Sequence, residues 1–304
     1  MSGLLDAYLL SAILMIVIGI LFGVFIARRF KLSPRLWFIG AAGFVLSQVG
    51  HIPFNNLVTQ LFAQGTLPPP APEWSNLFNA VFLGLSAGLF EELTRAAVYK
   101  WWAKDARSWR KGVFFGSGWG GIEAIILGAL ALLSFMSMLA MRGIDLAGLV
   151  PAEQLELARL QVEAYWAAPV PVRLLGAWER LATVPVHIAL SVIVLQAFIR
   201  RGSRIPGWVW VALAVLWHTL VNAVAVYLSR TIGTEGASVY IIEGVITLFS
   251  LASIGIIFAL RSPEPVEEPG IVPEAPALKT AAELLGEDAD SEVEAEDLDS
   301  SRYA

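Results

Sequence analysis

Seven long apolar runs constrain the fold of this chain more than any other feature of its sequence. A helix needs about 20 predominantly apolar residues to cross a hydrocarbon core about 30 Å thick, and each run reaches that length. We therefore predict an all-α, polytopic transmembrane helix bundle of about seven spans, a multi-pass integral protein of the cell membrane. The runs cover approximately residues 7–27, 36–57, 77–99, 112–140, 172–199, 207–228 and 237–260.

Composition supports this prediction and divides the chain in two. With 57% hydrophobic and 15% charged residues, a soluble globular protein is excluded. The absence of cysteine excludes disulfides, thiolate metal ligands and cysteine nucleophiles, which leaves histidine and carboxylate as the reactive side chains. Residues 262–304 hold 13 acidic and 2 basic side chains, and residues 1–261 hold 13 acidic and 19 basic ones. We expect a transmembrane domain over 1–261 and a disordered acidic tail over 262–304.

The distribution of Lys and Arg between the connections predicts the orientation. The connections after the first, third and fifth runs hold twelve basic residues, whereas those after the second, fourth and sixth hold three. Cytoplasmic loops near span ends carry the excess of positive charge. The N-terminus should therefore lie outside and the C-terminus in the cytoplasm. In the fourth connection, apolar residues at helical spacing over 152–166 predict a short helix at the outer interface.

Several ionisable side chains lie inside the predicted spans, where each costs about 2.5–3.5 kcal/mol on insertion scales. Counted from the basic residues at the cytoplasmic ends, four of them lie nine, twelve, thirteen and fourteen residues deep. At about 1.5 Å per residue they share a level about 14–21 Å into the membrane. Four separate helices could therefore contribute to one site. The four residues are Glu91, Glu123, His187 and His218.

Spacing within the helices indicates which polar side chains share a face. Glu91 with Arg95, and His218 with Asn222, are four residues apart and project from the same side. Glu91 and Glu92 lie about 100° apart around the helix axis, so one can face a pocket while the other pairs with Arg95. A carboxylate without a compensating charge at low dielectric suits a general acid or base.

Four motifs, taken in order, resemble the YhfC family. They are Glu91-Glu92-x-x-Arg95, the glycine-rich segment 116–123, His187, and His218-x-x-x-Asn222. The pattern of the YhfC family is matched weakly by two further pairs, Glu179-Arg180 before His187 and Gln48 with Pro53 in the second span. The resemblance covers roughly residues 48–260, all spans except the first. This family of intramembrane proteases is related to the PrsW proteases and, more distantly, to the CAAX-processing and bacteriocin-immunity group.

The resemblance implies peptide-bond hydrolysis within or at the edge of the membrane. Carried over, Glu91 would activate water, Glu92 would pair with Arg95, and His218 with Asn222 would line the site and stabilise the oxyanion. The spacing from the two glutamates to Arg95 matches that of the PrsW proteases rather than that of the CAAX group. Where the CAAX group has a histidine on the next motif helix, this chain has Trp119 and, one turn later, Glu123. His187 is our candidate for the assisting histidine.

Two mechanisms stay open at this point. Glu91, Glu123, His187 and His218 could supply a zinc shell, with a coordinated water as nucleophile. No HExxH or other ligand spacing is present, and we favour a metal-free glutamate mechanism without a cofactor, with zinc as its rival. The expected partners are membrane lipids and a membrane-protein or peptide substrate. No nucleic-acid partner is expected, because membrane topology and anionic lipid explain the basic loops.

Other functions remain as alternatives. A proton- or cation-coupled transporter could use Glu91, Glu123 and His218 as a relay, although no internal repeat is evident, and a catalytically inactive scaffold is a third interpretation. Any one of the polar residues alone could be structural, because buried histidines commonly hydrogen-bond across helices. We expect a structural role for His51, and Glu179 and Glu243 to snorkel or pair with Arg180.

Overall fold

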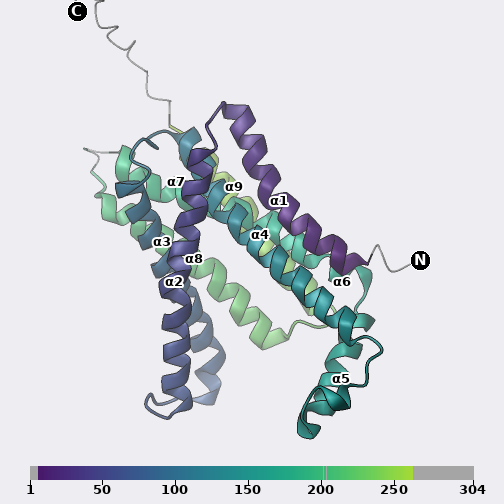
Figure 1. The fold of residues 1–304 in the computed structure, drawn as a ribbon. Coiled ribbons are helices and arrows are strands. Elements are labelled where there is room, and N and C mark those ends of the chain that lie inside the picture. The colour runs from purple at the N-terminus through teal and green to yellow at the C-terminus, as the bar shows by residue number, and fades with distance from the viewer. Residues whose placement is uncertain (1–5, 201, 203, 263–304) are drawn as a thin grey trace, which may run out of the picture. The chain divides into compact units, whose positions relative to one another are not determined.

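The computed structural model describes residues 6–200, 202 and 204–262, and every regular element in these ranges is helical. Seven helices are long and apolar enough to cross a membrane, which confirms the predicted all-α fold class and number of spans. The predicted acidic tail lies outside the described residues apart from Ser262. The seven helices are α1 (Ala7–Phe30), α2 (Arg35–Ala63), α3 (Ser75–Trp101), α4 (Trp109–Met141), α7 (Leu175–Ile199), α8 (Gly207–Ile232) and α9 (Ser238–Ala259) (Figure 1).

The largest boundary error concerns α2. Hydropathy ends the second apolar run at residue 57, whereas the helix continues to Ala63 and contains Pro53 in its interior. Polar residues such as Asn55 and Thr59 end the apolar signal, but they do not stop the backbone from remaining helical. Similarly, the fifth run begins with a separate short helix, α6 (Val170–Arg173), because Pro171 starts it within its first turn.

The connections contain the remaining elements. Short 3₁₀ turns occur at η1 (Pro72–Trp74) and η2 (Leu146–Gly148). The helix predicted over 152–166 is α5 (Ala152–Ala167), which has no buried residue and projects beyond the end of α4 (Figure 1). An ion pair between Arg173 Nη1 and Asp6 Oδ2, 3.0 Å apart, joins α6 to the start of α1.

Helix α7 forms the centre of the bundle. It packs against α1, α3, α4, α8 and α9, and 78% of its best membrane-spanning window is buried, a far larger share than in any other span. Its sequence is apolar on all sides from Val184 to Leu195 apart from His187 and Ser191. A helix that is apolar all round becomes an interior helix, and here it carries His187 into the core.

The glycine-rich part of α4 allows this helix to approach both α2 and α7 closely. A Cβ atom at Gly118 would overlap the backbone carbonyl of Trp37 on α2. A Cβ atom at Gly120 would lie 3.0 Å from Cβ of His187 on α7. Small residues at such crossings permit backbone contact between membrane helices. This close packing brings Trp119 and Glu123 of α4 up to the polar side chains of α3 and α7.

Candidate active site

The polar residues of the spans meet at one small cavity between α3, α4, α7, α8 and α9. Its volume is about 160 Å³. Because one water needs only about 10–15 Å³ of such space, several waters fit. The structure therefore brings together the residues that the sequence places at one depth. The lining residues are Glu91, Glu123, Glu179, Arg180, Thr183, Val186, His187, His218, Val221, Asn222, Ala225 and Ile246.

Glu91 of α3 lies at the wall of this cavity and is 6% exposed. Its Oε1 accepts a hydrogen bond from Gln48 Nε2 on α2, at 3.2 Å. Its Oε2 accepts one from the Trp119 indole on α4, at 2.9 Å. The Arg95 guanidinium lies 3.9 Å away, beyond direct hydrogen-bond distance. Neutral donors on two neighbouring helices thus hold the Glu91 carboxylate in place, and its charge is only partly offset by the arginine.

Glu92, the next residue, is fully buried and has two partners. Its Oε2 lies 3.1 Å from Arg95 Nη1, as the predicted Glu92–Arg95 pair requires. Its Oε1 lies 2.8 Å from Nδ1 of His218 on α8. A carboxylate accepts, so Nδ1 of His218 carries a proton, and in the neutral ring the lone pair is on Nε2. No other side chain among the described residues hydrogen-bonds Nε2, and His218 lines the cavity.

The second histidine is supported in the same way. Nε2 of His187 lies 2.5 Å from Oε2 of Glu123 on α4, so this ring donates through Nε2. Its Nδ1 lies 3.9 Å from Glu91 Oε2 and accepts from Arg95 Nη2 at 3.5 Å. The imidazoles of His187 and His218 stand nearly perpendicular, with ring centroids 5.8 Å apart. Glu92 thus holds His218, which lines the cavity, and Glu123 holds His187, whose Nδ1 lies near Glu91.

Glu123 is held on both sides. Besides His187, it binds Arg180 of α7, whose Nη1 lies 2.6 Å from Glu123 Oε1. Arg180 also pairs with Glu179, as expected. Glu243 is 8% exposed and does not snorkel, and no hydrogen bond to its Oε2 is formed by the described residues. The Arg180–Glu123 pair was not predicted. An arginine on a buried helix indicates that an acidic partner is needed, but its spacing does not say which acid that is.

Two further residues complete the surroundings. Asn222 lines the cavity one turn after His218, and no hydrogen bond engages its amide among the residues that the structure describes. His51 hydrogen-bonds Gln48 Oε1, Ser86 Oγ and Asn55 Nδ2. It lies away from the cavity and supports Gln48, the donor to Glu91, in agreement with the structural role expected for it.

The donor set suits a divalent metal ion. One ligand atom each from Glu91, Glu92 and His218 lies within 4.8 Å of the others. Carboxylate oxygen and imidazole nitrogen are ligands that zinc accepts, and a catalytic site leaves a position open for water. Glu91, Glu92 and Arg95 together carry one formal negative charge, which a cation would offset. Of the three candidate ligands, Glu92 already faces Nδ1 of His218 and Arg95, and a carboxylate commonly supports a metal-binding histidine in this way.

Comparison with known proteins identifies the family. A family model described as YhfC intramembrane metalloprotease matches residues 14–246. The chain belongs to the YhfC family. It is 29% identical over 231 residues to a protein of Bacillus subtilis (strain 168) named "Uncharacterized membrane protein YhfC", covering 75% of this chain and 86% of that relative. No solved structure matches significantly.

Membership of the YhfC family confirms the resemblance and corrects its extent, because the match includes most of the first span. It supports an intramembrane protease in a multi-pass membrane protein. The preference for a metal-free glutamate mechanism gains nothing from the comparison, since the YhfC family is described as metalloproteases. The transporter alternative gains no support either.

Proposed function

We propose that this chain is a metal-dependent intramembrane peptidase, and that the cavity bordered by Glu91, His187 and His218 is where a peptide bond is hydrolysed. The observation that carries the proposal is the pair of histidines, each held by a carboxylate and both close to Glu91. A purely structural polar cluster would need neither the cavity nor the unused His218 nitrogen beside it. The family description points to the same chemistry.

Glu91 and His218, whose ligand atoms lie within 4.8 Å of each other, would hold the metal. When bound, a zinc ion polarises the peptide carbonyl and lowers the pKa of a bound water. The other two ligands suggested by the sequence are already engaged. Arg180 and His187 bind the two oxygens of Glu123, and Arg95 donates to Nδ1 of His187. Glu123 positions His187 instead.

The side chains of the protein perform the remaining tasks. Glu91 contacts the attacking water and takes up its proton, and its hydrogen bonds from Gln48 and Trp119 fix the carboxylate in place. The free amide of Asn222 is available to donate to the developing oxyanion. Glu92 keeps Nε2 of His218 turned to the cavity. The substrate is a membrane-embedded or membrane-proximal polypeptide, since the site lies inside the bundle.

Cleavage and metal content of one preparation test the proposal. The full-length chain would be reconstituted into proteoliposomes with a library of fluorogenic transmembrane peptides, and its metal content measured in parallel. We expect about one zinc per chain, cleavage that a chelator abolishes, and recovery when zinc is returned. Cleavage by metal-free protein at the full rate would reject the metal-dependent mechanism. Solute or ion flux that requires Glu91, without any cleavage, would reject the peptidase.

A further inference from the structure

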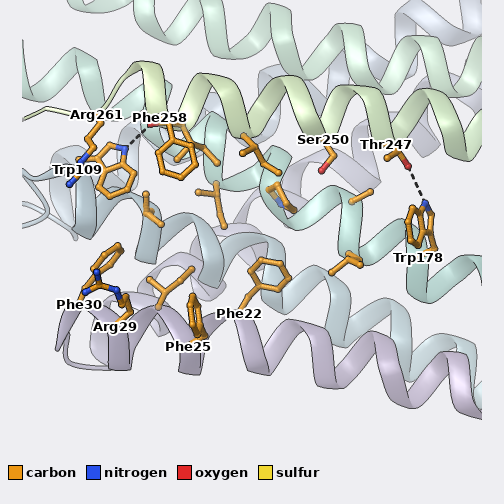
Figure 2. A pocket seen from close by; sticks show the side chains of 18 residues that line it. Phe22, Phe25, Arg29, Phe30, Trp109, Trp178, Thr247, Ser250, Phe258 and Arg261 are labelled. Atoms are coloured by element: carbon orange, nitrogen blue, oxygen red, sulfur yellow. Dashed lines mark hydrogen bonds between the residues drawn. The ribbon is translucent and has the colours of Figure 1, made fainter.

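A second and larger cavity lies on another side of α7. Helices α1 and α9 each pack against α7 but have no substantial contact with each other, and a cavity of about 600 Å³ remains between them. Figure 2 shows its lining side chains, which come from α1, α4, α7 and α9. It shares no lining residue with the candidate active site. This α1–α9 groove is therefore separate from the candidate active site.

The walls of the α1–α9 groove are apolar over most of its length. Phe22, Phe25 and Ile26 face it from α1. The indole N–H groups are already engaged, because Trp109 Nε1 donates to Ile257 O at 2.8 Å and Trp178 Nε1 donates to Thr247 Oγ1 at 3.0 Å. Apart from Ser250, little in the middle of the groove would bind a polar ligand. The wall therefore suits a hydrocarbon chain.

One end of the groove is positively charged. Arg29 at the end of α1 and Arg261 just after α9 lie at the same end, beside Phe30 and Trp109 (Figure 2). The Arg261 guanidinium lies 5.3 Å from the centroid of the Trp109 ring. Among the described lining residues none is acidic, and both arginines are exposed. An anionic group would find two cations and no opposing charge there.

The length of the groove corresponds to one leaflet of a bilayer. On α9 its lining extends from Thr247 to Phe258, which is about 17 Å of helix at about 1.5 Å per residue. Half of a hydrocarbon core is about 15 Å. The charged end lies at the side that the distribution of Lys and Arg predicts to be cytoplasmic, where anionic headgroups attract basic residues.

We propose that the α1–α9 groove is a binding site for an anionic phospholipid, with an acyl chain along Phe22, Phe25 and Ile254 and its phosphate between Arg29 and Arg261. The apolar wall alone would accept any acyl chain. The two arginines make the site selective for a negatively charged headgroup over a zwitterionic one.

Native mass spectrometry of the full chain tests the site. The protein is released from micelles that contain equimolar palmitoyl-oleoyl phosphatidylglycerol and palmitoyl-oleoyl phosphatidylcholine. We expect phosphatidylglycerol to be retained preferentially. An Arg29→Gln/Arg261→Gln variant should bind it about thirtyfold more weakly, given about 1 kcal/mol per basic side chain near anionic lipid. A matched Lys104→Gln/Arg204→Gln variant removes the same charge from exposed sites outside the groove and should bind as the wild type does.

A second variant separates the groove from the membrane surface. Ile254→Trp fills the apolar wall and leaves both arginines in place, and it should also lose phosphatidylglycerol. Equal retention of both lipids by the wild type would overturn the proposal, as would unchanged retention by the arginine variant. Full retention of phosphatidylglycerol by Ile254→Trp would also overturn the proposal. If that variant kept the lipid but lost a bound transmembrane peptide or a second copy of the chain, that partner and not the lipid would be the occupant of the groove.

Discussion

Glu92 Oε1 lies 2.8 Å from Nδ1 of His218, so a carboxylate without solvent exposure holds a histidine that borders the cavity. The adjacent Glu91 has a different environment, because neutral donors on α2 and α4 bind its oxygens. Two neighbouring acids on one helix thus have separate tasks. Glu92 hydrogen-bonds an imidazole and offsets Arg95, whereas Glu91 lines the cavity of the proposed site.

Removing the charge of Glu92 should impair catalysis through His218. A Glu92→Gln variant leaves an amide that need not fix the ring, and Glu91, 3.9 Å away, becomes the only carboxylate paired with Arg95 among the described residues. Losing such a supporting partner typically costs 10–100-fold in activity or metal affinity. We expect a loss of about that size in the cleavage rate, together with weaker zinc binding by titration. Glu156→Gln on the exposed face of α5 is the control, and an equal loss there would mean that the effect is unspecific.

The Arg180–Glu123 ion pair should stabilise the fold as well as position His187. Arg180→Gln leaves Glu123 with only His187 as a partner at a largely buried position. Breaking a buried pair from one side costs about 3–5 kcal/mol, and we expect the free energy of unfolding in micelles to fall by about 3 kcal/mol.

A double-mutant cycle isolates this interaction. The combined Arg180→Gln/Glu123→Gln variant should lose at least about 1 kcal/mol less than the sum of the two single losses, because the second change removes a charge already left unpaired. Strict additivity of the two losses would show that the contact contributes no stability.

The close approach of α2 and α4 at Gly118 gives a prediction independent of the chemistry. A Cβ atom there would overlap the carbonyl of Trp37, so Gly118→Ala must push the two helices apart. Overpacking of this kind costs about 1–3 kcal/mol or more. We expect a clear drop in the thermal midpoint. Gly255→Ala on α9 is the matched control, since nothing lies within 4 Å of its Cβ position and the change should leave the midpoint unchanged or raise it.

The predicted orientation can be tested directly because the chain has no cysteine. Ser33, between α1 and α2, should lie in the cytoplasm, and Thr66, between α2 and α3, should lie outside. A Thr66→Cys variant should react with a membrane-impermeant maleimide in intact cells. A Ser33→Cys variant should react only after permeabilisation. The reverse pattern would invert the topology and place the arginines of the α1–α9 groove at the outer surface.

The sequence predicts the parts of this site well and its pairings less well. Hydropathy and the 1.5 Å rise suffice to place Glu91, Glu123, His187 and His218 at one level, because depth depends only on counting residues. Which acid meets which histidine depends on the rotation of each helix about its axis. In nearly uniform apolar helices that rotation is set by close contacts, such as those of Gly118 and Gly120, rather than by an amphipathic pattern. The Glu92–His218 and Glu123–Arg180 contacts were therefore not predictable from spacing.

The most direct test of the proposed function compares the cleavage rate of Glu91→Gln with that of the wild type in proteoliposomes containing a transmembrane peptide substrate. The amide keeps nearly the same shape but can neither take up the proton of water nor offer a carboxylate to a metal. We predict a loss of at least about 10²-fold, in the range of general-base catalysis, with an unchanged thermal midpoint. Glu73→Gln, at an exposed position outside the spans, should retain full activity. Cleavage by Glu91→Gln at the wild-type rate would contradict the proposed site.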